Sequence, residues 1–401
     1  MIHRSLKYIT ASIWLSFVYL VSRPGSAIVT VIAFSASVVV FLSMFALRQS
    51  YAQAFSNSGS NRIAVILSSG VKNETDSMIP ARLISDINQI SGTSGSNTSF
   101  LLAPEIVSSL RVEYKSTNIP ATILFRGITP GYWRMHPFIR VVAGRSFNSG
   151  VDEVIVGKQA TLRFKNLQIG DYVKAADRRW QIVGEFTANH SLFESEVWTD
   201  SADLQDALHL GNNYSALLVE LADARSIGML RKRLNKIPNT SISVVSEKTY
   251  YKGQAAHTLE FMSLIAIIIT AVMGVSATLT SANILRNAIR TRTRDMATLG
   301  ALGYSRSFIA GFLIIENVTL GLLGGTAASV IIYFTLNHRE FSTMNFGGSL
   351  NSSYQIAFNI SIATSSITYS ILYAVVISIL GAFPAIYKAL KTPIALQIRD
   401  N

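Results

Sequence analysis

Four long stretches without a charged side chain constrain this chain more than any other feature. They lie at Ala27–Leu47, Phe261–Ile284, Asn317–Leu336 and Ile356–Ala385. A helix rises about 1.5 Å per residue, so about twenty apolar residues cross a hydrocarbon core of about 30 Å. Backbone groups in lipid need partners within their own segment, which favours a helix for each stretch. The chain is therefore expected to be integral to a membrane.

The position of these stretches predicts the domain organisation. One polar block, residues 49–254, separates the first span from the other three. We place the spans at 25–48, 255–285, 307–336 and 356–386, with a loop at 286–306, a short outer loop at 337–355 and a tail at 387–401. The predicted fold class is membrane α-helical, with four transmembrane helices and a large extracytoplasmic α+β domain inserted between the first two.

The distribution of cations predicts the orientation. Lys and Arg gather before the first span, between the second and third, and after the fourth: Arg4, Lys7, Arg23, Arg286, Arg290, Arg292, Arg294, Arg306, Lys388, Lys391 and Arg399. Cytoplasmic loops carry an excess of such residues. Both termini and the 286–306 loop are therefore expected in the cytoplasm, and the polar block outside.

The segment before the first span has two interpretations. Its apolar residues recur every three or four positions at Ile2, Leu6, Ile9, Ile13, Phe17 and Leu20, which is typical of an amphipathic helix at a membrane surface. We assign residues 1–24 to such a helix. A signal peptide is the alternative, but Arg23 and Pro24 fit poorly at a cleavage site.

The polar block reads as a mixture of short strands and amphipathic helices, in one or two lobes. Strands are predicted at Ile63–Leu67, Ala121–Phe125, Glu153–Val156, Trp180–Val183, Ala216–Leu221 and Ile242–Val245. Helices are predicted at Ala81–Ile90, Ser201–Leu208 and Asp223–Ile237. The sequence contains no cysteine, so this block must be held together without disulfides.

No catalytic or metal-binding set emerges from the sequence. His136, His190 and His257 share no spacing that would place them on one metal ion, and they are read as ordinary core or surface residues. The acidic pairs Asp152–Glu153 and Glu194–Glu196 are read as solvated turn residues rather than a hydrolase pair. The net charge of +12 lies largely beside the apolar spans, which argues against nucleic acid as a partner.

The most specific segment is Arg290–Gly325, RTRTRDMATLGALGYSRSFIAGFLIIENVTLGLLGG. A basic cluster leads into a short predicted helix with Met296 and Leu299 three residues apart, and Gly300 and Gly303 then let the chain turn back. From composition alone, the arginines would serve only to set the topology.

This segment resembles the signature of the MacB/FtsX family of ABC transporter permeases. The matching features are Arg294-Asp295, the Leu299–Gly303 run, Glu316 and Gly324-Gly325. The C-terminal stretch from Gly381 to Leu396 is similar to the family's ending. In the polar block, Gly127–Pro130, Tyr132-Trp133, Ala143–Arg145, Val154–Gly157 and Ile169–Asp171 follow the order of the family's periplasmic core domain.

The resemblance implies a permease that is not itself an enzyme. No P-loop of the form GxxxxGKS or GxxxxGKT occurs, so ATP and Mg²⁺ are expected on a separate ATPase and no cofactor on this chain. In the family, the short helix between the second and third spans couples to the ATPase. The resemblance therefore assigns that role to Arg292, Arg294, Asp295, Met296 and Leu299.

The third span carries the remaining candidate residues. Glu316 lies directly before the Asn317–Leu336 stretch, within the predicted third span, and is expected to pair with a neighbouring helix, with a role in transport as the alternative. Gly321, Gly324 and Gly325, together with Ala327 and Ala328, are expected to allow close helix packing, which favours a dimer interface there.

The first functional hypothesis is a permease subunit of the bacterial inner membrane that drives export by mechanotransmission, as a dimer with a cytoplasmic ATPase. A periplasmic adaptor and an outer-membrane channel are further candidate partners, besides membrane lipids. The alternatives are a lipoprotein-extracting permease and an FtsX-like regulator of cell-wall hydrolases. The sequence does not name the cargo or distinguish a homodimer from a heterodimer.

Overall fold

The computed structural model describes residues 24–92, 101–113, 120–238, 241–292, 298, 303–346 and 353–391. The chain divides into two compact units. The helical unit comprises Met1–Arg48, Met262–Arg339 and Ile360–Asn401, within the described residues, and the domain unit comprises Gln49–Phe261 and Glu340–Asn359. The predicted helix at 1–24 lies outside the described residues apart from its last position.

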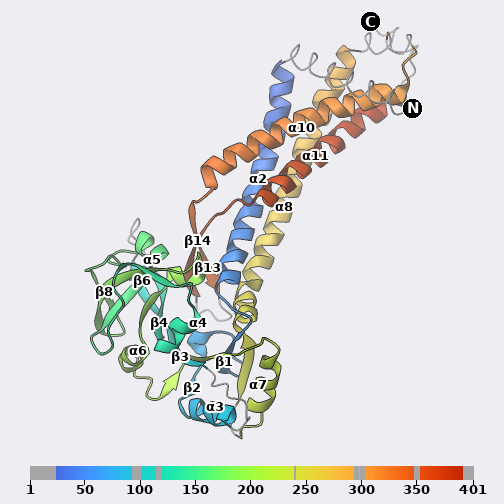
Figure 1. Ribbon diagram of the computed structural model, residues 1–401. Helices are drawn as coiled ribbons and strands as arrows, with labels where there is room; N and C mark the ends of the chain where they lie inside the picture. Colours follow the sequence, from blue (N-terminus) through green and yellow to red (C-terminus); the bar gives the residue numbers. More distant parts are fainter. Residues whose placement is uncertain are drawn as a thin grey trace. The chain divides into compact units, whose positions relative to one another are not determined.

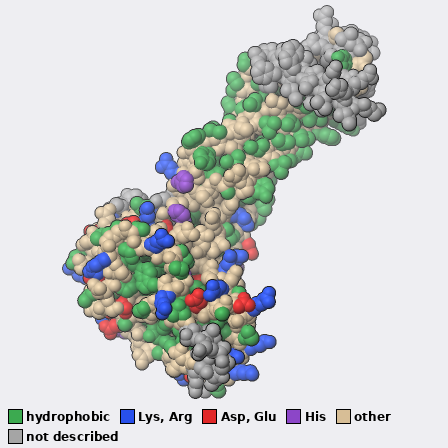
Figure 2. Space-filling model, in the orientation of Figure 1, with side chains coloured by type: hydrophobic (Ala, Val, Ile, Leu, Met, Phe, Trp, Pro, Cys, Tyr) green, Lys and Arg blue, Asp and Glu red, His purple; other side chains and the backbone are tan. Residues whose placement is uncertain are grey.

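Within the described residues, four helices are long and apolar enough to cross a membrane: α2, α8, α10 and α11. They run at Pro24–Asn57, Glu247–Thr291, Arg306–Leu336 and Thr364–Lys391 (Figure 1). Side chains of the helical unit are mostly apolar or uncharged on the face shown in Figure 2, whereas Lys, Arg, Asp and Glu mark the domain unit. This contrast is expected when lipid surrounds one unit and water the other.

Two of these helices continue from one unit into the other. The last turns of α2, Gln49–Asn57, belong to the domain unit, where Tyr51 and Phe55 are fully buried. The first turns of α8, Glu247–Phe261, also belong to the domain unit. Both helices therefore extend beyond the predicted spans, because apolar side chains of the domain cover these turns.

The structure corrects the predicted start of the fourth span and the predicted outer loop. Helix α11 begins at Thr364, whereas the prediction began the span at 356. The preceding residues form an antiparallel hairpin of β13, Glu340–Phe346, and β14, Ser353–Asn359. Ile356 and Phe358 are buried in the domain unit with the alternation of a strand. An apolar strand directly before an apolar helix is indistinguishable from one long span by hydropathy.

The domain unit is built on a mixed ten-stranded sheet. Its strand order is β12-β1-β11-β3-β4-β9-β6-β8-β5, with β7 paired to β8. The strands are β1 Ile63–Ser68, β3 Leu101–Glu113, β4 Pro120–Ile128, β5 Arg140–Gly144, β6 Glu153–Gly157, β7 Tyr172–Ala175, β8 Arg178–Thr187, β9 Val197–Asp200, β11 Ala216–Glu220 and β12 Ile242–Ser246. The pairs β4–β9 and β6–β8 are parallel, and the other pairs are antiparallel.

Short helices complete the domain unit: η1 Glu74–Asp76, α3 Arg82–Gly92, α4 Pro130–Met135, α5 Lys158–Arg163, η2 Leu192–Ser195, α6 Ser201–Ala207 and α7 Ser226–Leu234. A small pair of β2, Ile79–Pro80, and β10, Asn213–Tyr214, lies apart from the main sheet. One apolar core holds Trp180 and Phe125 with α5 and α6, and a second holds Leu83 and Leu230 with α3 and α7. Two cores thus share one continuous sheet.

All six predicted strands and all three predicted helices of this block are confirmed, within a few residues at their ends. Several elements were not predicted. The longest is β3, whose Ser108, Ser109 and Arg111 interrupt the apolar pattern. It is a central strand of the sheet, so its pairing on both sides stabilises a sequence with weak local preference.

Candidate coupling site

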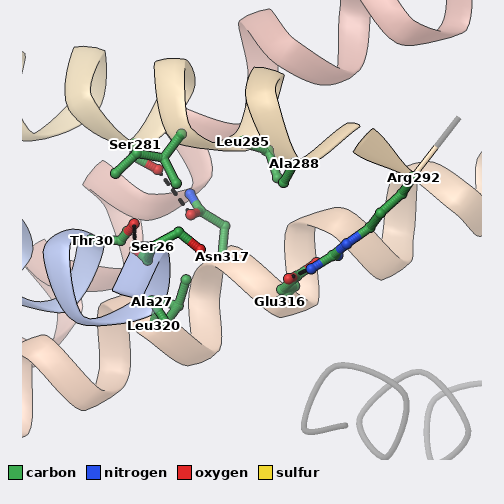
Figure 3. A pocket seen from close by; sticks show the side chains of 11 residues that line it. Ser26, Ala27, Thr30, Ser281, Leu285, Ala288, Arg292, Glu316, Asn317 and Leu320 are labelled. Carbon is green, nitrogen blue, oxygen red and sulfur yellow. Dashed lines mark hydrogen bonds and ion pairs between the residues drawn. The ribbon is translucent and has the colours of Figure 1, made fainter. Parts of the chain in front are cut away.

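A buried ion pair joins the end of α8 to α10. Arg292 is the first residue after α8, and its NH1 nitrogen donates to both carboxylate oxygens of Glu316, at 3.1 and 3.0 Å (Figure 3). Both side chains are less than a tenth exposed. A buried charge is tolerated when an opposite charge and hydrogen bonds satisfy it. The pair therefore fixes the point at which the chain leaves α8.

Asn317, the next residue of α10, links three helices through hydrogen bonds. Its Oδ1 accepts from the Ser281 hydroxyl of α8 at 2.9 Å, and its Nδ2 donates to the backbone oxygen of Ser378 in α11. A cavity of about 30 Å³ lies between this network and the ion pair, with Thr30 of α2 also in its wall (Figure 3). That volume is sufficient for a single water molecule beside polar partners.

Apolar packing and one helix cap hold the site in place. Leu285 of α8, Leu313 of α10 and Ala385 of α11 belong to one buried cluster. Helix α10 is capped by Ser305, whose hydroxyl accepts from the backbone N–H of Phe308 at 3.2 Å. The start of α10 is therefore fixed by a hydrogen bond at Ser305, just as the end of α8 is fixed by the ion pair at Arg292.

The predicted coupling residues are only partly within the described residues. Arg292 is described and lies in the ion pair, whereas Arg294, Asp295, Met296 and Leu299 lie outside. The assignment of all five to ATPase coupling stays a prediction.

The glycines of α10 meet helices of the same chain. A Cβ on Gly321 would lie 2.7 Å from Cβ of Ser378 in α11, and one on Gly325 would lie 2.9 Å from Cβ of Ala374. Gly324 faces α2, where its added Cβ would lie 2.9 Å from Cβ of Phe34. These three glycines therefore pack closely against α11 and α2 of the same chain, and a dimer interface stays a prediction.

A second buried charge cluster, in the domain unit, was not predicted. Arg126 of β4 forms two hydrogen bonds with Glu196, at 2.7 and 2.9 Å, and its NH1 also lies 2.8 Å from Glu105 and 3.1 Å from Glu74. All four side chains are nine-tenths buried or more. Isolated Glu and Arg residues in a sequence are typical of solvated positions, so the pattern gave no signal.

The structure corrects the interpretation of the acidic pairs as solvated turn residues. Glu194 and Glu196 are buried, because Glu194 accepts from the backbone N–H groups of Ala188 and His190, and Glu196 binds Arg126. Glu153 is also buried and pairs with Arg145. His136 is a core residue, one of the two readings given for it, and its Nε2 lies 2.8 Å from Glu247 at the start of α8. Among the described residues, no group of three or more His, Asp or Glu side chains could hold a metal ion.

Two protein families match this chain, one in its N-terminal part and one in its C-terminal part. Residues 26–237 match the MacB-like periplasmic core domain, and residues 262–394 match the FtsX-like permease C-terminal domain. The first match alone covers more than half of the chain. The chain belongs to the MacB/FtsX family of ABC transporter permeases. The resemblance seen in the sequence is therefore confirmed.

Individual relatives of this MacB/FtsX-family chain are distant. The probable syringafactin export ATP-binding/permease protein SyfD of Pseudomonas syringae pv. syringae (strain B728a) is 22% identical over 368 residues, covering 85% of this chain. The chain spans about half, 52%, of that relative's length.

Solved structures of extracytoplasmic permease regions also match. The extracellular domain of the transporter YknZ from Gram-positive bacteria is 20% identical, with a TM-score of 0.34, covering 46% of this chain and 99% of its own. The periplasmic region of MacB from Actinobacillus actinomycetemcomitans is 14% identical, with a TM-score of 0.34, covering 48% of this chain and 92% of its own.

Proposed function

We propose that this chain is the membrane subunit of an ABC transporter in which a separate ATPase drives movement of a periplasmic domain. ATP and Mg²⁺ bind to that ATPase, and the 292–303 segment receives its motion through Met296 and Leu299. The domain unit lies outside the bacterial inner membrane and responds without passing cargo through a channel in the helices. A second permease copy completes the transporter.

The ion pair between Arg292 and Glu316 is the observation that carries this proposal. Arg292 is the first residue of the 292–303 segment, and the ion pair joins it to α10. A displacement of this segment by the ATPase would therefore act on α8 and α10 together. Helix α8 then runs for 45 residues without interruption as far as Glu247 in the domain unit. A continuous helix transmits displacement along its axis, because its backbone hydrogen bonds hold its length.

Export is the favoured form of this function. The distant relative SyfD is a probable syringafactin export ATP-binding/permease protein. Lipoprotein extraction and regulation of cell-wall hydrolases use the same mechanical principle and are the alternatives. Pull-down with the full chain separates them, since a periplasmic adaptor supports export, a lipoprotein supports extraction, and a hydrolase supports regulation.

The coupling role is tested by the double variant Met296→Asp/Leu299→Asp in reconstituted membranes. We expect the variant to fold but to lose copurification and stimulation of the ATPase. The matched control is Met296→Leu/Leu299→Met, which keeps the apolar surface and is expected to behave as the wild type. The proposal is wrong if no ATPase copurifies with the wild type and the charged variant retains function.

A further inference from the structure

The helical unit contains a long groove between three of its helices. About 890 Å³ of open space lies along α8, and α2 and α11 form its other walls. The lining residues of α8 extend from Ser263 to Leu279, which corresponds to about 24 Å of helix. The walls are mostly apolar. Pockets that hold a small organic ligand have volumes of about 300–1,000 Å³, so the groove is large enough for one.

An arginine lies at one end of the groove. Arg48 is the first charged residue after the uncharged stretch Ala27–Leu47, and it is the last residue of α2 in the helical unit. Its side chain is exposed, and its Nε donates to the hydroxyl of Ser263 at 2.6 Å. Within the described part of the chain, Arg48 makes no other hydrogen bond and no ion pair. Its NH1 and NH2 nitrogens therefore remain available to an acceptor from outside the chain.

The inner wall of the groove is held in place by its own contacts. The rings of Phe41 in α2 and Tyr373 in α11 stack with their centroids 4.6 Å apart. The hydroxyl of Tyr373 lies 2.8 Å from that of Ser37 and donates to the backbone oxygen of Thr270 at 3.1 Å. A Cβ added to Gly274 would lie 2.7 Å from the same hydroxyl. This packing fixes the wall, so the groove is formed before any ligand binds.

The groove is narrower than another helix. Spread over about 24 Å, its volume corresponds to a mean cross-section of about 37 Å². A helix with its side chains is at least about 10 Å across, which corresponds to about 79 Å². An extended hydrocarbon chain is thinner than a helix and matches the apolar walls. The shape therefore favours the acyl chain of a lipid over a helix from a second copy of this chain.

The charge at the end of the groove indicates the headgroup of that lipid. Lipid phosphates lie at the boundary of the hydrocarbon core, where the first charged residue after an apolar span is also expected. A planar guanidinium binds phosphate through two parallel hydrogen bonds. Arg48 has two nitrogens for these bonds, while Ser263 holds the third. Charge and shape thus point to the same class of ligand.

We propose that this groove binds a membrane phospholipid, with its phosphate on Arg48 and one acyl chain along α8. Half of a hydrocarbon core is about 15 Å deep, which corresponds to about ten residues of helix. The chain therefore reaches from Ser263 to the neighbourhood of Gly274. That the lipid comes from the outer leaflet rests on the proposed function, which places the domain unit outside. Binding itself is independent of that function.

This site differs from ordinary contact between an arginine and the surrounding lipid. An exposed arginine at the end of a span extends toward headgroups in any bilayer. Such contact depends on Arg48 alone, whereas binding in the groove also depends on open space beside Ala271, two to three helical turns from Ser263. A variant that fills this space without touching the charge separates the two.

The test is native mass spectrometry of the full chain in detergent micelles, titrated with palmitoyl-oleoyl-phosphatidylglycerol. No ATPase is present, so the result does not depend on the proposed function. The wild type is expected to retain one lipid per chain, and Arg48→Gln should bind it about tenfold more weakly. Arg339→Gln is the matched control, because Arg339 is exposed, follows α10 and does not line the groove. It should bind as the wild type.

Filling the groove is the second arm of the test. Ala271→Phe places a ring in the groove and should also weaken binding about tenfold or more. Val272→Phe, at the next residue, is exposed but does not line the groove, and should leave binding unchanged. Since Arg48→Gln changes an exposed side chain, it keeps the proposal testable if Ala271→Phe does not fold.

Palmitoyl-oleoyl-glycerol, which has the same chains without the phosphate, completes the comparison. We expect it to bind the wild type about tenfold more weakly than the phospholipid does, and to bind Arg48→Gln and the wild type equally. The proposal is overturned if both lipids bind the wild type equally, or if Ala271→Phe and Val272→Phe bind the phospholipid alike. A dimer that excludes the lipid held by the monomer would assign the groove to a second copy and would also overturn it.

Discussion

The NH1 nitrogen of Arg292 donates to both carboxylate oxygens of Glu316, and the two side chains bury each other between α8 and α10. Replacing one residue of the pair leaves the other charge buried and unpaired, whereas replacing both residues by apolar ones leaves no buried charge. This difference allows its structural and coupling roles to be separated.

Glu316→Met is expected to destabilise the helical unit by about 3–5 kcal/mol, because Arg292 is left buried without its partner. The double variant Arg292→Met/Glu316→Met replaces the pair by apolar side chains and should recover most of that loss. Thermal unfolding in nanodiscs measures both. If the double variant is as unstable as the single one, the ion pair is not the source of the loss.

Close packing of α10 on α11 predicts opposite effects at two glycines of the same helix. A Cβ at Gly321 would lie 2.7 Å from Cβ of Ser378 and 3.0 Å from the backbone oxygen of Ala374, so Gly321→Ala should cost about 1–3 kcal/mol. Gly311 has no heavy atom within 4 Å of its added Cβ. Gly311→Ala should be neutral or stabilise by about 0.5–1 kcal/mol, through helix propensity. Equal effects on thermal unfolding would contradict the packing.

Asn317 is expected to matter because it bonds to two other helices. Asn317→Ala removes the bonds to Ser281 and Ser378 and should cost about 1–2 kcal/mol. Asn283→Ala, at an exposed position of α8, is the matched control and should change the unfolding free energy by less than about 0.5 kcal/mol. A similar loss of unfolding free energy in Asn317→Ala and Asn283→Ala would contradict a stabilising role for the hydrogen bonds of Asn317.

The sequence predicted those features that depend on local pattern. The apolar runs located the four long helices seen in the described part of the chain, and β-branched runs such as Ile63–Leu67 located strands of the sheet. The β13–β14 hairpin was missed because Ile356 and Phe358 merge into the apolar run of α11. Hydropathy measures how apolar a segment is and does not distinguish burial in protein from burial in lipid.

The buried charges could not be predicted for a different reason. Arg126 and its carboxyl partners come from separate elements, and only the folded sheet brings them together. Glu316 was expected to pair, but its partner Arg292 was assigned to the coupling segment. A pairing between residues 24 positions apart leaves no periodic trace in the sequence.

The raised pKa of Glu105 predicts how the stability of the domain unit depends on pH. Burial keeps this carboxyl neutral in the folded chain up to about pH 8, whereas in the unfolded chain it ionises near pH ~4. Between these values the folded state binds more protons, so its unfolding free energy falls as the pH rises. The contribution of Glu105 is complete below about pH 4 and is lost through about pH 8.

Glu105→Gln tests this directly, because the amide mimics the neutral acid and cannot ionise. Its oxygen can still accept from Arg126, which lies 2.8 Å from the carboxyl group. The variant should match the wild type below about pH 4 and unfold at an increasingly higher temperature than the wild type as the pH rises to about 8, where Glu105 of the wild type ionises in the folded chain. Glu220→Gln, at a partly exposed position, is the control and should leave the pH profile unchanged. A Glu105→Gln profile that parallels the wild type would show that another group of the cluster carries the proton.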